Sequence, residues 1–287
     1  MRRAIAVFAA VAVLASFSSA VNVSLPLSAP SSSQPLSRTL VSLSIEQDRW
    51  PDWTGIKTRN QFTYNALQNF AELTGQPPKL RVGADSEDHT FWAPITDIIE
   101  DVFPPPTADT PYPEATNITV DDAYYALSRF LPKGTHFVWG INFAADNVTN
   151  AVNMAKAIFR AFDDDAVRSA GVVVDRLEIG NEPDIYGFVG HRAENYTVED
   201  YVSEWEPLAG AVVEAVGIQG NTSAVTVQGA AFAFPAFPIT ELFSLGILNS
   251  TAGQAISTSV HRTSTVTMVE LTASLSAYPS ITTLYLS

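Results

Sequence analysis

Short apolar runs alternate with longer amphipathic segments along most of the chain. Five of the apolar runs have the length and composition of buried strands. They lie at residues 40–45, 79–82, 136–141, 172–179 and 225–228. Four other segments carry apolar residues at helical spacing, which predicts helices. They lie at residues 60–73, 119–131, 148–162 and 198–216, with Gly75 as the stop of the first and Thr119 as the cap of the second.

Strands that alternate with helices predict parallel strands joined by right-handed crossovers, in either an open doubly wound sheet or a closed barrel. The chain has no G-x-G-x-x-G or G-x-x-x-x-G-K-[ST] motif, which would favour the open sheet. The sequence therefore predicts an α/β fold of the (β/α)8 TIM-barrel type. Eight units at the spacing of these strands would need about 368 residues after residue 40. Because the whole chain has 287 residues, we expect the barrel to be truncated after about five or six β/α units.

The two ends of the chain differ from this alternating part. Residues 1–20 combine two arginines, an apolar run and a small-residue ending, the pattern of a secretory signal peptide. Residues 21–38 are expected to form an extended lead-in, and residues 39–249 the partial catalytic barrel. Residues 250–287 are a tail rich in serine and threonine. This tail is interpreted either as a β-rich extension or as the mis-spliced or frame-shifted end of a longer reading frame.

Composition narrows the class of protein. A chain that is 46% hydrophobic and 16% charged is too apolar to be disordered. The net charge of -14 argues against nucleic acid and anionic membrane surfaces as partners. With no cysteine and no metal-ligand spacing among its four histidines, the chain is expected to hold no metal and no cofactor. The sequence gives no indication of oligomeric state.

Six N-x-S/T sequons follow the predicted signal peptide. They begin at Asn22, Asn117, Asn147, Asn195, Asn221 and Asn249. Sequons are glycosylated only in proteins that enter the secretory pathway. We therefore expect a secreted, extracellular glycoprotein, with no membrane partner after signal cleavage.

The strongest chemical signal is the stretch Leu177–Asp184, at the end of the fourth predicted strand. Barrel active sites are built at such strand ends. A glutamate there can protonate the leaving oxygen of a glycosidic bond if burial raises its pKa, which makes Glu182 the candidate acid. The neighbouring Asn181 can donate a hydrogen bond to a sugar hydroxyl. The alternative interpretation is a polar turn between strand and helix.

This stretch resembles a known family when it is combined with two others. Ser42–Glu46 and Leu80–Ser86, at the ends of the first two predicted strands, together with Leu177–Tyr186 resemble glycoside hydrolase family 79, and most of all its fungal β-glucuronidases. The resemblance covers about residues 21–246. It implies an exo-acting, retaining hydrolase that removes terminal glucuronic acid from glycans, with Glu182 acting first as acid and then as base.

The resemblance also implies that Glu46 and Asn181 bind the hydroxyls of the terminal sugar. Asp85 follows the second predicted strand and is expected either to line the cleft or to lie in a solvated loop. Asn142 and Trp139 end the third predicted strand and are the candidates to face the cleft, although core packing is the commoner role of a tryptophan. The predicted substrate-binding residues are thus Asn181, Glu46, Asp85 and Asn142.

The family pattern requires a second glutamate, the nucleophile, at the end of the seventh strand. By the unit count no residue of this chain matches that position, and the nucleophile is left unassigned. Glu270 is the only late glutamate, and its flanking sequence is unlike that of the family. Two alternatives therefore stand beside the β-glucuronidase hypothesis: an inactive barrel fragment that is at most a weak carbohydrate binder, and another member of the clan, such as an arabinofuranosidase or xylosidase.

Overall fold

The computed structural model describes residues 36–95, 97–234 and 236–261, together with residues 28, 31 and 33. The chain divides at residue 37, and the fold described here belongs to the unit that begins at Arg38. The predicted signal peptide, Asn22, Glu270 and the tail beyond residue 261 lie outside the described residues.

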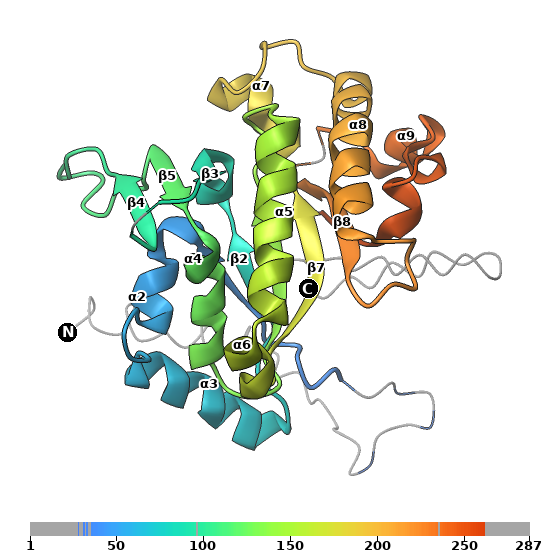
Figure 1. The fold of residues 1–287 in the computed structure, drawn as a ribbon. Coiled ribbons are helices and arrows are strands. Elements are labelled where there is room, and N and C mark those ends of the chain that lie inside the picture. Colours follow the sequence, from blue (N-terminus) through green and yellow to red (C-terminus); the bar gives the residue numbers. More distant parts are fainter. Residues whose placement is uncertain are drawn as a thin grey trace, which may run out of the picture. The chain divides into compact units, whose positions relative to one another are not determined.

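The core of the fold is a six-stranded parallel sheet in which the strands follow one another in chain order, β1-β2-β6-β7-β8-β9 (Figure 1). The strands are β1 (Leu43–Glu46), β2 (Leu80–Gly83), β6 (His136–Ile141), β7 (Val173–Ile179), β8 (Thr226–Phe232) and β9 (Ile256–His261). Sequential parallel strands with helical crossovers are the topology of a (β/α)8 barrel. The described residues supply six of its eight strands, which confirms the expectation of a truncated barrel.

The sixth strand lies beyond residue 249, where the sequence analysis ended the barrel. β9 pairs with β8 in parallel register. Its sequence, Ile-Ser-Thr-Ser-Val-His, lacks a continuous apolar run, and this hid it in the tail rich in serine and threonine. Isoleucine, threonine and valine are nevertheless β-branched residues, which suit a strand.

Helices connect the strands, and the long ones cover the outer face of the sheet. They are α2 (Trp50–Thr54), α3 (Gln61–Thr74), α4 (Asp122–Ala126), α5 (Val148–Asp163), α6 (Asp165–Ala170), α7 (Tyr186–Val189), α8 (Val198–Val216) and α9 (Ile239–Ser244). The two long helices α5 and α8 pack side by side (Figure 1). The predicted helices at 60–73, 148–162 and 198–216 are confirmed, and α8 begins at a capping box formed by Thr197 and Asp200. Within the described ranges, no helix is both long enough and apolar enough to cross a membrane.

The predicted helix at 119–131 is wrong in its first part. Thr119 lies in β5 (Asn117–Val120), and the cap of the short helix α4 is Asp121, whose carboxylate accepts a hydrogen bond from the backbone N–H of Tyr124 at 3.2 Å. β5 joins β3 (Thr90–Trp92) and β4 (Ile99–Val102) in a small separate sheet. The β-branched run Ile-Thr-Val favours this strand over a helix.

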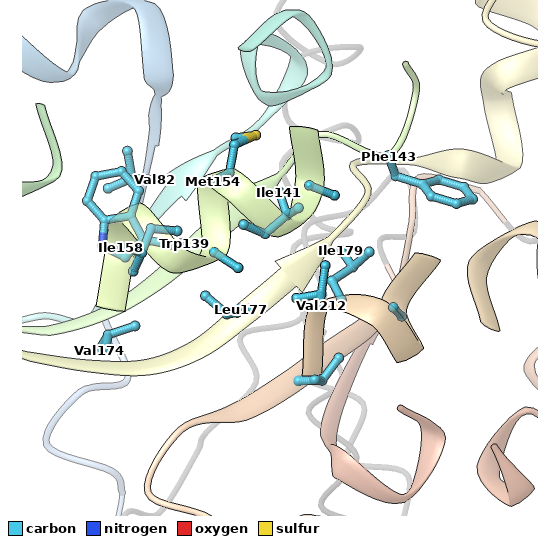
Figure 2. Packing of buried hydrophobic residues seen from close by; sticks show 14 of the residues in the cluster. Val82, Trp139, Ile141, Phe143, Met154, Ile158, Val174, Leu177, Ile179 and Val212 are labelled. Carbon is cyan, nitrogen blue, oxygen red and sulfur yellow. The ribbon is translucent and has the colours of Figure 1, made fainter. Parts of the chain in front are cut away.

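The hydrophobic core lies between the outer face of the sheet and the helices. Figure 2 shows side chains of β6 and β7, among them Ile141 and Leu177, packed with Met154 and Ile158 of α5 and with Val212 of α8. Interiors of this kind are close-packed, so that each large side chain contributes several kcal/mol.

Trp139 belongs to this core and not to the cleft, which corrects the sequence-based expectation. It is fully buried and packs with Trp50, Phe137 and two tyrosines, at ring-centroid distances of 5.1 to 6.0 Å. Successive side chains of a strand point to opposite faces. Trp139 therefore faces the helices, and the next residue, Gly140, faces the interior of the barrel.

The core assignment predicts a difference between two identical substitutions. Phe137 is fully buried, whereas Phe62 on α3 is 81% exposed. Phe137→Ala is expected to lower the free energy of unfolding by about 3–5 kcal/mol, and Phe62→Ala by no more than about 0.5 kcal/mol. Urea denaturation of both variants measures this, and equal losses would contradict the assignment.

Candidate active site

The polar residues singled out by the sequence analysis gather at the carboxyl ends of the strands. Asp85 opens the short 3-10 helix η3 (Asp85–His89) after β2, and Glu182 precedes η5 (Pro183–Ile185) after β7. Parallel strands place these ends at the same edge of the sheet. A pocket of about 210 Å³ lies there. It is lined by Asp85, Asp88, His89, Glu114, Asn181, Glu182, Ile185, Tyr186, Val189 and His191.

Three of the predicted residues therefore share one pocket: Asp85, Asn181 and Glu182. The Asn181 amide connects them to the sheet, because its Nδ2 donates to Asp85 Oδ1 at 2.9 Å and its Oδ1 accepts from Arg81 Nη2 at 2.8 Å. The amide is thus fixed from both sides, and its orientation does not depend on a ligand.

Glu182 has an unusual backbone. Its φ of 48° lies in the left-handed region, which costs a residue other than glycine about 1–3 kcal/mol. Its N–H donates to the carbonyl of Ala231 at 2.9 Å, and its carbonyl accepts from the N–H of Ile185 at 3.0 Å. The strain is thus held in place by β8 on one side and by η5 on the other.

The other strained positions follow the same pattern. In the described part of the chain, four residues other than glycine have a positive φ: Ala84, Asp146, Glu182 and Ala230. Three of them follow the carboxyl ends of β2, β6 and β7, and Ala230 lies two residues before the end of β8. Strained backbone clusters at functional sites, which marks this end of the barrel as the functional one.

Asp184 ties the same turn to the segment that follows β8. Its two carboxylate oxygens accept hydrogen bonds from the backbone N–H groups of Ala233 at 2.8 Å and Phe234 at 2.7 Å. These charge-assisted bonds hold the loop after β8 against the turn that carries Glu182.

Glu46 lies close to the pocket, and its carboxylate forms hydrogen bonds with the loop after β2. One of its carboxylate oxygens accepts from the N–H of Ser86 at 3.0 Å and from its hydroxyl at 2.5 Å. Burial raises the pKa of Glu46, and these two hydrogen bonds oppose the shift. In this structure Glu46 therefore positions the loop that presents Asp85.

Asn142 does not belong to the pocket. Its side chain is buried, with Nδ2 donating to the carbonyl of Thr90 at 3.0 Å and Oδ1 accepting from the N–H of Ala145 at 2.9 Å. The amide is engaged by backbone groups on both sides, so the structure adds no support to the expectation that it binds substrate. It fastens the loop after β6 to β3.

A buried ionic network lies beneath the pocket, on the inner face of the sheet. Arg81 of β2 donates from Nε to Glu178 Oε1 of β7 at 2.7 Å, and Gln228 of β8 donates to the other oxygen of Glu178. Glu87 lies 3.9 Å from Arg81. Burial and the negative charge of Glu178 raise the pKa of Glu87 well above its ordinary value.

Space for the Glu87 carboxylate is made by two glycines. A Cβ atom at Gly140 would lie 1.9 Å from Glu87 Oε2, and one at Gly83 would lie 2.3 Å from it. The sequence signal for this network was the presence of polar residues within otherwise apolar strands. Period-two alternation places them on the inner face.

Two further carboxyl groups of the pocket have raised pKa values. Burial raises the pKa of Asp88 to about 8, although its Oδ1 accepts from the Tyr186 hydroxyl at 2.8 Å. Partial burial and the neighbouring carboxylates of Glu46 and Asp85 raise the pKa of Glu114, at the exposed rim, to about 7. The described residues contain no cluster of three or more potential ligands that could hold a metal ion. The arrangement suits proton transfer near neutral pH.

The buried network predicts a stability loss that depends on pH. Arg81→Met leaves the carboxylates of Glu178 and Glu87 without a cation and is expected to lower the free energy of unfolding by about 3–5 kcal/mol at pH 7. A carboxyl group whose pKa is raised on folding destabilises the fold increasingly as pH rises above its unfolded pKa. The loss is therefore expected to be smaller at pH 5 than at pH 7 in urea denaturation.

A second variant isolates the charge effect. Arg81→Met combined with Glu178→Gln removes one of the stranded charges and is expected to recover part of the stability. A loss that is independent of pH and is not recovered would show that Arg81 acts by packing alone.

Comparison with known proteins gives two curated relatives and a structural neighbour, whereas no family model matches the chain. A β-glucuronidase of Aspergillus niger is 29% identical over 175 residues, which cover 60% of this chain and 31% of the relative. A β-glucuronidase of Neurospora crassa is 26% identical over 190 residues, which cover 65% of this chain and 33% of the relative. The chain thus spans about a third of the length of these relatives.

The structural neighbour is a 4-O-α-L-rhamnosyl-β-D-glucuronidase from Fusarium oxysporum, solved as a Rha-GlcA complex. It has a TM-score of 0.60 at 19% identity, over 82% of this chain and 46% of that chain. At this identity the likeness concerns the fold. Together these findings confirm that the chain resembles the fungal β-glucuronidases of glycoside hydrolase family 79 and has the α/β fold of a truncated (β/α)8 barrel.

Proposed function

We propose that the chain carries the acid/base half of a retaining β-glucuronidase site, with Glu182 as the acid/base. The observation that supports this most is the placement of Glu182. It lies in a strained left-handed conformation at the carboxyl end of β7, in a pocket shared with Asn181 and Asp85. The β-glucuronidase names of both curated relatives support the reaction type.

In this mechanism Glu182 protonates the glycosidic oxygen as the bond to the leaving group breaks, and then takes a proton from the water that attacks the sugar. Asn181 Nδ2 uses one N–H on Asp85 and has a second N–H for a sugar hydroxyl. A bond to a hydroxyl next to the reacting carbon strengthens as the sugar flattens toward the oxocarbenium-like state.

A retaining reaction also needs a nucleophile about 5–5.5 Å from the acid. The family pattern places it on the seventh strand, and the six described strands do not include that one. The second candidate function is a carbohydrate-binding barrel without turnover. The presence of Glu182, Asn181 and Asp85 in one pocket is compatible with both functions. A measurement of turnover distinguishes them.

Substitution of Glu182 tests the enzymatic proposal. With aryl β-glucuronide as substrate, Glu182→Gln is expected to lower the rate at least about 100-fold, because the glutamine amide cannot exchange the proton. Aryl β-glucoside and aryl α-arabinofuranoside are assayed beside it to identify the sugar. Added azide, an attacking group that needs no base, is expected to restore part of the release.

The matched control is Glu199→Gln, which makes the same change at an exposed position of α8. It is expected to retain full activity. A purified chain that turns over none of the three substrates, or whose turnover is the same with Glu182→Gln, contradicts the enzymatic proposal and leaves the carbohydrate-binding function.

We also propose that the protein is secreted and N-glycosylated. Four of the sequon asparagines are exposed. They are Asn117, Asn147, Asn195 and Asn249, while Asn221 is half-buried. In a eukaryotic secretory host these four are expected to carry glycans, which enzymatic deglycosylation in heavy-oxygen water followed by peptide mass spectrometry detects. A secreted chain with none of the four modified would contradict this proposal.

A further inference from the structure

Two histidines from separate segments lie next to each other in the lining of the pocket. His89 is the last residue of η3, after β2, and His191 lies just after α7, beyond Glu182. Both line the pocket, and their ring centroids are 5.7 Å apart. The fold thus brings together two imidazoles that are about a hundred residues apart in sequence, beside the candidate acid.

The ring nitrogens of His89 and His191 have no hydrogen-bond partner in the part of the chain that the structure describes. The His191 ring packs edge-on against Tyr186 at 5.1 Å, which fixes its plane without occupying its nitrogens. Both residues are half-buried. Two neighbouring imidazoles in the lining of a small pocket can offer two N–H donors to a ligand group with two acceptor oxygens.

Apart from Asn181, whose second N–H is assigned above to a sugar hydroxyl, the remaining polar side chains of the pocket do not suit an anion. Asp85, Asp88, Glu114 and Glu182 are acidic, and the Tyr186 hydroxyl already donates to Asp88. The histidines are the only lining side chains, in the part of the chain that the structure describes, that can become positively charged. The most favourable position for a negatively charged substituent of a sugar in this pocket is therefore beside His89 and His191.

We propose that His89 and His191 together bind the carboxylate of an acidic sugar, and that this contact selects a uronic acid over the neutral sugar. The proposal rests on the proposed function, which places the sugar in this pocket. Loss of the contact weakens binding of the acidic sugar and leaves binding of the neutral sugar unchanged.

The surrounding charges make this contact dependent on pH. Burial lowers the pKa of His191, as do the positive charges of His89 and Arg192, whereas Asp85 opposes the shift. Glu114, with a pKa of about 7, loses its negative charge between pH 7.5 and pH 5, whereas Asp88, with a pKa of about 8, is already mostly neutral at pH 7.5. Acidification therefore adds positive charge and removes negative charge at the same place. Binding of a carboxylate is expected to tighten between pH 7.5 and pH 5.

Calorimetric titration of the purified chain with D-glucuronate and with D-glucose, at pH 5 and pH 7.5, tests the proposal. Neither probe carries a leaving group, so the measurement does not require turnover. At pH 5, His89→Gln and His191→Gln are each expected to weaken glucuronate binding about 10-fold or more, with no change for glucose. The tightening between pH 7.5 and pH 5 is expected to disappear in the double variant.

His136→Gln is the matched control, because His136 begins β6 at the opposite end of the sheet and pairs with Asp175 at 2.6 Å. It is expected to bind both sugars like the parent chain. Thermal unfolding of every variant distinguishes a lost contact from a lost fold. Acetate and inorganic phosphate, titrated as competitors, distinguish a site for the sugar carboxylate from a general anion site.

The outcomes separate the two proposals. Glucuronate binding that is unchanged in the histidine variants, or no tighter than acetate binding, overturns the assignment of His89 and His191 while the proposed function stands. A parent chain that binds neither sugar at either pH overturns the histidine proposal, whereas the proposed function is decided separately by the turnover of aryl β-glucuronide.

Discussion

The ion pair between Arg81 and Glu178 is the interaction on which the rest of the barrel interior depends. Burial disfavours the charge of Arg81, but the carboxylates of Glu178 and Glu87 outweigh this and raise its pKa. A buried charge without a partner costs several kcal/mol, so the strands that carry these residues are held in one register. Arg81 also donates to Asn181. The same arginine therefore forms the ion pair and fixes the orientation of the Asn181 amide, the candidate sugar-binding group.

Strand alternation explains how this polar interior coexists with a dense core. The outer faces of the strands carry the aromatic and aliphatic side chains that meet α5 and α8, and the inner faces carry Arg81, Glu178 and Gln228. The inner face of β6 contributes Gly140, whose missing side chain leaves space for a carboxylate. One period-two pattern thus builds two environments of opposite polarity on the two faces of a single sheet.

The sequence predicts the elements whose signals are local. Helices α3, α5 and α8 have regular periodicity and side-chain caps, and the first five barrel strands are short apolar runs between them. The turn with Asn181 and Glu182 was found because a polar motif directly follows such a run. The small sheet of β3 to β5, the polar strand β9 and the pairing of His89 with His191 depend on contacts between distant segments, which no local pattern carries. Trp139 in β6 was placed correctly along the chain, but its side chain points to the helices and not to the cleft, and Asn142 directly after β6 points into the fold.

The turn from Asn181 to Asp184 is bonded to several strands at once. Asn181 contacts residues of β2 and of the loop that follows it, the N–H of Glu182 donates to β8, and Asp184 accepts from the segment after β8. These partners are distant in sequence, so the contacts that hold the turn against the sheet are expected to form only after β2, β7 and β8 have come together. Opening of this turn is consequently coupled to separation of the strands, and its backbone amides should exchange with solvent only in openings that also disrupt the sheet.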